Sequence, residues 1–227
     1  MPSVFLGHDI SDDKKQELLS SSKSQIKQDI FVYLNSRKKR NGFFVEFGAC
    51  DGIALSNSYM LEEKFSWTGI LVEPSVFWFN KLKGNRPLSH IENAGVWSKT
   101  GEALVFNQTE ESYLSTIDQY TNRDSLSDRR QKGIKYEVRT ISLFDLLRKY
   151  NAPQTIDYLS IDTEGSEFDI LAAFFKQNNN FYSINIVTCE HNYTADRERI
   201  YALMVANGYE RVGTDFSAHD DFYILKQ

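Results

Sequence analysis

The stretch FFVEFGACDG, residues 43–52, indicates the fold class of this chain. Its first five residues form an almost continuous apolar run, which is typical of a strand buried on both faces of a parallel sheet. The run carries one acid, Glu46, and then breaks into small residues before Asp51. A buried carboxylate needs hydrogen-bond donors or a ligand. The stretch therefore fits either a strand that leads into a ligand-binding loop or a core strand followed by an ordinary turn.

Strand-like and helical patterns alternate along the rest of the chain. Further strands are expected at residues 69–74, 90–96, 155–162, 182–190, 209–217 and 220–227. Amphipathic helices are expected at residues 53–65, 76–84, 141–150, 166–177 and 196–208. Such alternation predicts an α/β fold, with a mainly parallel, Rossmann-like sheet and helices on both faces. The strand pair after the last helix predicts one antiparallel strand.

The length and the composition favour one domain. The chain has 227 residues, of which 41% are hydrophobic, so residues 1–227 are expected to form a single domain with a sizeable core. Residues 11–40 have the pattern of a helical segment. Residues 102–107 and 135–140 alternate in polarity and predict an antiparallel hairpin. The polar stretch between them fits either a lid or a disordered segment, so residues 102–140 are expected to be an insertion.

Charge and hydropathy argue against several kinds of partner. The formal net charge of −5 argues against a basic face that binds a nucleic-acid polymer. No stretch approaches the ~20 apolar residues of a membrane span. The chain begins without a basic segment followed by an apolar one, and Cys50 and Cys189 lie beside apolar strand-like runs, as interior fillers do. We therefore expect a protein of the reducing cytoplasm, with no membrane partner.

Acids stand where four of the expected parallel strands end. Ligands of open α/β sheets bind outside these carboxyl ends. A single acid there fits a helix N-cap or an ion pair, but acids at four strand ends favour a binding site. The residues are Glu46 and Asp51 after the first strand, Glu73 after the second, Asp162, Glu164 and Glu167 after the strand at residues 155–162, and Glu190 with His191 after the strand at residues 182–190.

The loop after the first strand lacks the glycine patterns of phosphate-binding loops. Neither G-x-G-x-x-G nor G-x-x-x-x-G-K-[ST] is present. The loop carries an acid, Asp51, rather than a lysine, and this suits a cationic ligand better than a pyrophosphate. Glu73 ends the next strand, where a carboxylate can bind the hydroxyls of a ribose. A ribose and a cation without a phosphate describe S-adenosylmethionine.

Several segments together resemble a known family. They are SQIKQDIFVYL, GFFVEFGACDG, GILVEPS, KLKGNRP, TISLFDLL and IDYLSIDTEGSEFDIL, and they follow one another from Ser24 onward. In this ordered set, the chain resembles the FkbM-type methyltransferases of the class I S-adenosylmethionine-dependent superfamily. The resemblance implies a seven-stranded sheet of order 3-2-1-4-5-7-6 whose seventh strand is antiparallel. It also implies transfer of a methyl group to a hydroxyl, commonly on a sugar or a natural product.

The resemblance also implies which residues bind the cofactor. The segment after the first strand matches the motif that wraps the methionine end, although Cys50 and Ile53 replace the most glycine-rich version of that motif. Glu73 matches the acid that binds the ribose hydroxyls, and Asn93 and Ala94 fall where the adenine is flanked. The expected cofactor-binding residues are Glu46, Gly48, Ala49, Asp51, Gly52, Glu73, Asn93 and Ala94.

A sugar hydroxyl keeps its proton at neutral pH, so its methylation needs a general base or a metal. Asp162, Glu190 and His191 take the positions of the metal ligands in metal-dependent relatives of this superfamily. A histidine ligand would favour Mn, Fe, Co or Zn over Mg, which prefers oxygen. Without a metal, His191, Asp162 or Glu164 is the expected catalytic base. The alternative is that the acids form ion pairs and His191 packs against the lid.

The expected acceptor is a small-molecule sugar, either a saccharide or a nucleotide-activated sugar. In the second case, a phosphate would need cations, and the basic residues near the expected site are Arg86, Arg123, Arg129 and Arg130. A methyltransferase of a non-sugar small molecule, a nicotinamide-dependent oxidoreductase and a non-catalytic binding module are the alternatives. The missing G-x-G-x-x-G argues against the oxidoreductase. The oligomeric state stays open.

Overall fold

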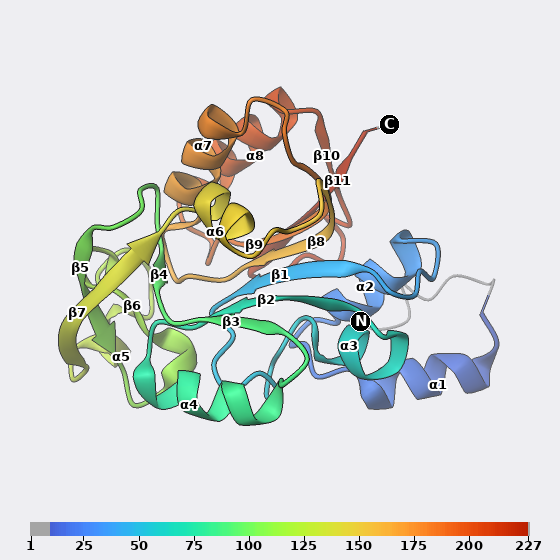
Figure 1. Cartoon of the computed structure of the whole chain (residues 1–227), viewed down its shortest axis with the longest axis horizontal. Helices are drawn as coiled ribbons and strands as arrows, with labels where there is room; N and C mark the ends of the chain where they lie inside the picture. The colour runs from blue at the N-terminus through green and yellow to red at the C-terminus, as the bar shows by residue number, and fades with distance from the viewer. Residues whose placement is uncertain (1–9, 227) are drawn as a thin grey trace.

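A computed structural model describes residues 10–226, and its main feature is a seven-stranded sheet (Figure 1). The strand order is β10-β11-β9-β8-β1-β2-β3. Only β11 runs against its neighbours, pairing antiparallel with β9 and β10. The predicted order and the antiparallel last strand are therefore confirmed. The strands are β1 (Phe43–Phe47), β2 (Thr68–Val72), β3 (His90–Glu92), β8 (Thr155–Ile161), β9 (Ser183–Glu190), β10 (Tyr209–Val212) and β11 (Asp220–Leu225).

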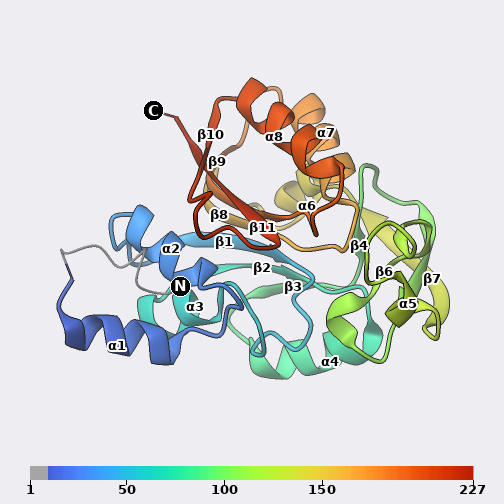
Figure 2. The ribbon, with the colours of Figure 1, turned by 180° about the vertical axis from the view of Figure 1, so that it is seen from behind.

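Helices cover both faces of this sheet (Figures 1 and 2). One face carries α6 (Leu143–Lys149), α7 (Glu167–Asn178) and α8 (Asp196–Ala206), and the other carries α1 (Asp12–Ser21), α2 (Gln28–Asn35), α3 (Tyr59–Phe65) and α4 (Val76–Asn85). Because side chains alternate along a strand, β1 contributes to both cores. Val45 and Phe47 pack with α6, α7 and α8, whereas Phe44 packs with the N-terminal helices. This explains why β1 is apolar on both faces except at Glu46.

Serine side chains cap two of the helices that begin beside the sheet. Ser75 accepts a hydrogen bond from the backbone N–H of Trp78 at the start of α4, and Ser142 accepts one from Asp145 at the start of α6. The helix predicted at residues 53–65 is shorter than expected, because α3 begins only at Tyr59. The backbone N–H groups before it donate to acids instead of forming helical turns, as described below.

The expected insertion, together with β4 just before it, forms a second, four-stranded sheet of order β4-β7-β5-β6. Its strands are β4 (Gly95–Val96), β5 (Ala103–Gln108), β6 (Thr116–Ile117) and β7 (Ile134–Ile141). The predicted antiparallel pairing is confirmed, since β5 and β7 pair from Ala103↔Arg139 to Gln108↔Ile134. Between them lie the short helices η1 (Ser112–Leu114), η2 (Asp118–Tyr120) and α5 (Ser127–Arg130). Figure 1 shows this sheet beside the carboxyl ends of the central strands.

Among the helices of residues 10–226, none has both the length and the apolar character that crossing a bilayer requires.

Arg86 at the end of α4 is the basis of a stability prediction. Its guanidinium is fully buried, pairs with Glu62 of α3 at 3.0 Å, and donates to the carbonyl oxygen of Gly52 at 2.9 Å. Replacing Arg86 by methionine leaves the buried carboxylate of Glu62 without its cation. We expect Arg86→Met to lower the free energy of unfolding by about 3–5 kcal/mol, measured by urea denaturation.

Lys99→Met is the matched control, because the Lys99–Glu102 ion pair is largely exposed. Its effect should stay below about 0.5 kcal/mol. A loss below about 1 kcal/mol in Arg86→Met would contradict the structural role of the buried pair.

Candidate active site

A pocket lies at the carboxyl edge of the main sheet, where the loops after β1, β2 and β8 meet. The insertion closes one side of it with Phe106, Ser115 and Ile117. Gln25, which precedes α2, and Gln28, the first residue of α2, also line it. Eight of the predicted site residues line this pocket. They are Glu46, Gly48, Ala49, Asp51, Glu73, Ala94, Asp162 and Glu164.

Glu46 is buried, and the segment before α3 satisfies its carboxylate. One oxygen accepts the backbone N–H of Asn57 at 2.7 Å, and the other accepts the hydroxyls of Ser56, at 3.0 Å, and Ser58. Asp51 accepts the N–H groups of the two residues that follow Gly52, at 2.9 Å each. These bonds hold residues 53–58 in a non-helical loop around the pocket, which explains the late start of α3.

Gly48 stands where the ends of β1 and β8 come closest. Its φ of +69° lies in the left-handed region, and a Cβ there would lie 2.2 Å from the backbone carbonyl oxygen of Asp162. No side chain fits at this distance, so glycine is required. The backbone of Gly48 thus approaches the end of the neighbouring strand closely. The consequence is that the loops after β1 and β8 border the same pocket.

Glu73 connects the loops after β1 and β2. Its carboxylate accepts the backbone N–H of Cys50 at 2.9 Å and that of Ser75 at 2.8 Å. Burial raises the pKa of Glu73 to about 7. The carboxylate is thus held rigidly on the pocket wall by backbone donors, and its remaining lone pairs can accept further hydrogen bonds.

Two predicted cofactor-binding residues do not line the pocket. Gly52 faces α4, where a Cβ would lie 2.4 Å from Leu82 and 2.7 Å from Arg86. The side-chain amide of Asn93 donates to the backbone carbonyls of Glu73 and Pro74, at 2.8 and 3.0 Å. Both residues shape the walls from outside, because their local bonds direct them away from the cavity.

Hydrogen bonds within the segment IDTEGSE, at the end of β8, fix its conformation. Glu167, at the start of α7, accepts the backbone N–H groups of Thr163, at 2.9 Å, and Gly165, at 3.0 Å. Glu164 has a φ of 59° and Gly165 a φ of 126°. A Cβ on Gly165 would also lie 2.9 Å from Tyr120 of the insertion. This tight turn directs Glu164 back toward Asp162.

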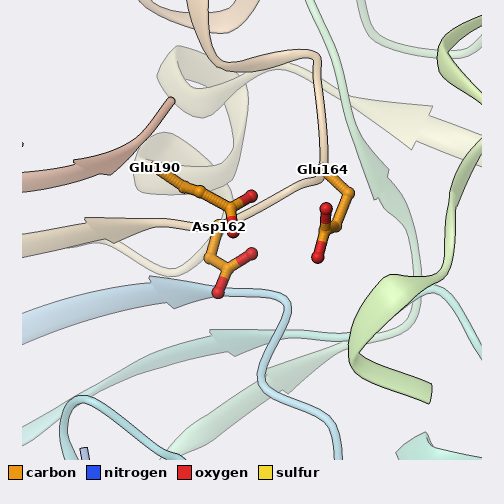
Figure 3. Close-up of side chains that lie close together, drawn as sticks. All are labelled: Asp162, Glu164 and Glu190. Carbon is orange, nitrogen blue, oxygen red and sulfur yellow. The ribbon is translucent and has the colours of Figure 1, made fainter. Parts of the chain in front are cut away.

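Three carboxylates converge beside the pocket. Oxygens of Asp162, Glu164 and Glu190 all lie within 4.8 Å of one another. Figure 3 shows the three side chains, from the ends of β8 and β9 and from the turn between β8 and α7, directed toward a common space. Glu190 is buried, and its Oε2 has no hydrogen-bond partner among the described residues.

The carboxylates of this cluster are buried and lie close to one another, so the ionised form of each is disfavoured. Burial first, and then repulsion by the neighbouring carboxylates, raises the pKa of Asp162 and of Glu190 well above the usual range. Burial also raises the pKa of Glu164 to about 8, although Arg130 opposes this. A group of acids in this state accepts either protons or a cation.

The insertion supplies the one cation that contacts the cluster among residues 10–226. Arg130 is fully buried and donates to Glu164 at 2.5 Å, to Asp124 at 2.7 Å and to the carbonyl oxygen of Leu114 at 2.8 Å. Thr116 of β6 also donates to the backbone carbonyl of Glu164, at 2.8 Å. These bonds fasten the insertion to the turn that follows β8.

His191 lies outside the carboxylate cluster, contrary to its predicted place as a metal ligand. Its Nδ1 accepts the backbone N–H of Tyr193 at 3.0 Å, and its Nε2 lies 3.7 Å from Asp221. Burial lowers the pKa of His191 to about 4. The tight turn after β9 directs the ring away from Asp162, and Glu164 takes the place predicted for His191 in the cluster.

The four arginines considered for phosphate binding all pair with carboxylates. Arg86 pairs with Glu62, Arg123 with Asp196, Arg129 with Glu111, and Arg130 with Asp124 and Glu164. None of the four lines the pocket. Their expected phosphate-binding role is therefore not supported.

Sequence reasoning missed several residues of the pocket wall. Asn57 and Ser56 lie in a segment expected to be helical, and Gln28 lies in a segment that showed only helical spacing. Gln28 donates to the buried Asp220 at 2.9 Å and so joins α2 to β11 across the sheet edge. A buried amide at the start of an apolar helix is the sequence feature that could have identified Gln28.

Comparison with known proteins agrees with this geometry. A family model described as the methyltransferase FkbM domain matches residues 46–222. No curated protein matches the chain in sequence. Among solved structures, the METTL16 methyltransferase domain is similar, with a TM-score of 0.52 and 10% identity over 88% of this chain and 66% of that one.

An O-methyltransferase from Bacillus cereus in complex with SAH covers 100% of both chains at 11% identity, with a TM-score of 0.48. At such identities these likenesses concern the fold alone, and the second is too distant to carry an argument. Since the family match spans most of the chain and the observed strand order is the one expected for that family, the chain belongs to the FkbM family of methyltransferases.

Proposed function

We propose that this protein transfers the methyl group of S-adenosylmethionine to a hydroxyl of a sugar. The observation that carries the proposal is the placement of two kinds of acid on one pocket. Glu73 is held at the end of β2, and Asp162 and Glu164 lie at the end of β8 on the wall of the same cavity. The first suits the binding of a ribose, and the others suit the removal of a proton from an acceptor.

The residues of the pocket fit S-adenosylmethionine. Glu73 would accept hydrogen bonds from the ribose hydroxyls, and the backbone at Gly48 and Ala49 would border the methionine end. Ala94, which is buried and follows β3, would lie against the adenine. The sulfonium supplies an already activated methyl group. The protein therefore has to align the acceptor oxygen with the carbon–sulfur bond and to remove its proton.

Asp162 is the residue best placed to accept that proton. It lies on the pocket wall, whereas Glu164 is already bound by Arg130 and by Asn192 at 2.9 Å. The raised pKa of Asp162 brings its proton affinity closer to that of a base that works near neutral pH. Glu190 lies behind Asp162 and could share the proton within the cluster.

A divalent cation is the alternative way to lower the pKa of the acceptor hydroxyl. Asp162, Glu164 and Glu190 offer oxygens within 4.8 Å of one another, and within residues 10–226 the Oε2 of Glu190 has no hydrogen-bond partner. With His191 outside the cluster, the ligands are all oxygens, which suits Mg²⁺ or Mn²⁺ better than Zn, Fe or Co. A cation bound there would stabilise the ionised form of an oxygen that contacts it.

The function is tested by incubating the protein with methyl-labelled S-adenosylmethionine and a panel of glycosides and free sugars. We expect label in a methyl ether of at least one sugar. Asp162→Asn should lower this transfer by about 10²-fold or more, as loss of a general base does, while cofactor binding by calorimetry is retained. Binding of S-adenosylmethionine without transfer to any sugar, together with transfer to a non-sugar hydroxyl, would contradict the sugar assignment.

Glu73 is tested by cofactor affinity. In Glu73→Gln, one backbone N–H of Cys50 or Ser75 faces an amide NH₂ instead of an oxygen, and the ribose loses a charged acceptor. We expect the affinity for S-adenosylmethionine to fall by about 1.5–3 kcal/mol, measured by titration calorimetry. Glu92→Gln, at the end of β3 and outside the pocket, is the control and should bind normally. Equal affinities of the two variants would remove the ribose-binding role.

The metal is tested by binding as well as by activity. After treatment with a chelator, the protein should bind one Mg²⁺ or Mn²⁺ per chain in calorimetry, and the ion should raise its melting temperature. Glu190→Gln removes a charged ligand and should abolish this binding, whereas Glu210→Gln on the exposed side of β10 should not. Wild-type protein that binds neither ion and remains fully active in chelator would show that the cluster works through protons alone.

A further inference from the structure

The turn after β9 lies beside the carboxylate cluster but outside the pocket. Glu190 ends β9, and two residues later the side-chain amide of Asn192 donates to Glu164 at 2.9 Å. The same oxygen of Glu164 accepts the guanidinium of Arg130, so the turn and the insertion meet at this acid. Neither Asn192 nor Tyr193, the residue after it, lines the pocket. The turn therefore borders the candidate site from outside the cavity that fits the cofactor.

Hydrogen bonds hold this turn in one conformation. The backbone N–H of Thr194 donates to the carbonyl oxygen of His191 at 2.8 Å, and the N–H of His191 donates to the carbonyl oxygen of His219 at 2.8 Å. The backbone N–H of Tyr193 donates to Nδ1 of the buried His191 at 3.0 Å. A side chain carried on this turn is thus positioned before a ligand binds, which lowers the entropy lost on binding.

Tyr193 combines a strained backbone with an exposed side chain. Its φ is 57° and that of Asn192 is 42°, so two consecutive residues other than glycine lie in the left-handed region. Asparagine tolerates this conformation, whereas a tyrosine there is uncommon and costs free energy. Burial of the ring does not offset the cost, because Tyr193 is 71% exposed and its ring stands edge-on to that of His191. Strained residues of this kind cluster at ligand-binding sites.

The ring of Tyr193 offers a flat apolar surface with a hydroxyl at one end. A sugar ring has apolar faces of C–H groups, which can pack on such a surface while the hydroxyls around its rim stay in water. The methyl transfer proposed above takes place beside Asp162, which lines the pocket, whereas Tyr193 does not. A sugar that packs on Tyr193 is therefore a neighbour of the unit that is methylated.

We propose that Tyr193 binds the sugar unit next to the one that is methylated, and that the acceptor is a glycan of at least two units. This inference rests on the proposed function and narrows it, because it favours an oligosaccharide over a free monosaccharide. The geometry that carries it is an exposed aromatic ring on a rigid, strained turn that contacts the carboxylate cluster through Asn192.

Acceptors of different length test the inference. Methyl-labelled S-adenosylmethionine is offered with methyl glycosides of single sugars, with the corresponding disaccharides, and with nucleotide sugars. We expect kcat/KM for the preferred disaccharide to exceed that for its monosaccharide by about tenfold, as one additional aromatic contact provides.

Variants of Tyr193 show whether this preference comes from its ring. Tyr193→Ala should lower kcat/KM for the disaccharide by about tenfold and leave that for the monosaccharide nearly unchanged, while the affinity for S-adenosylmethionine by calorimetry stays the same. Tyr193→Phe keeps the ring and should keep the preference. Phe181→Ala is the matched control, because Phe181 is 53% exposed and precedes the opposite end of β9. Its kinetics should equal those of the wild type.

The outcomes separate the inference from the proposed function. Equal kcat/KM for monosaccharide and disaccharide, or the same loss for both in Tyr193→Ala, would overturn the inference and leave the function intact. A preference for nucleotide sugars over disaccharides that depends on Tyr193 would overturn it as well. Methyl transfer to no sugar of any length would overturn the proposed function and the inference with it. A preference for the disaccharide that Tyr193→Ala removes and Tyr193→Phe keeps would establish the inference.

Discussion

The close approach of two strand ends is the constraint on which the site depends. β1 and β8 are hydrogen-bonded neighbours at the centre of the sheet, and the loop after β1 leaves the sheet past the carbonyl of Asp162. A Cβ at Gly48 would lie 2.2 Å from that carbonyl oxygen, so any other residue would push the two loops apart. The loops after β1 and β8 therefore line one cavity.

The buried carboxylates differ in how many hydrogen bonds the protein donates to them. Glu46, Glu73 and Glu167 each accept two or more hydrogen bonds from backbone N–H groups and hydroxyls, and each holds a loop in place. Asp162 and Glu190 have raised pKa values, and Glu190 has an oxygen without a partner among the described residues. Burying carboxylates without donors costs stability. The unsatisfied acids are therefore the ones that a ligand, a proton or a cation has to complete.

Much of the fold followed from the sequence because its patterns are set by burial. β1 packs in both cores, and its nearly continuous apolar run therefore indicated a central strand. The start of α3 was misjudged for a physical reason. Residues 53–58 have helical spacing, but Glu46 and Asp51 take their backbone N–H groups and hold them in a loop. Hydrogen bonds between segments, such as these, cannot be predicted from the local spacing of apolar residues.

The candidate site was predictable in its position but not in the direction of its side chains. Acids at strand ends indicated the correct edge of the sheet, and Asp162 and Glu190 do converge there. Spacing alone does not show that the turn after β9 directs His191 toward Asp221. Nor does it show that the side-chain amide of Asn93 donates to backbone carbonyls. Glu164 was a candidate base, yet its contact with the insertion needed the three-dimensional structure.

The insertion covers the pocket without adding a charged side chain to its wall. It brings Arg130, a fully buried cation, to the carboxylate cluster, but it places the guanidinium behind Glu164 and holds it there with Asp124 and a backbone carbonyl. The charge of Arg130 thus stabilises the turn after β8 and does not reach the cavity. Had the same arginine faced the cavity, the wall would carry an anion-binding group. Because it does not, the side chains that the insertion adds to the pocket wall are all uncharged, namely those of Phe106, Tyr113, Ser115 and Ile117.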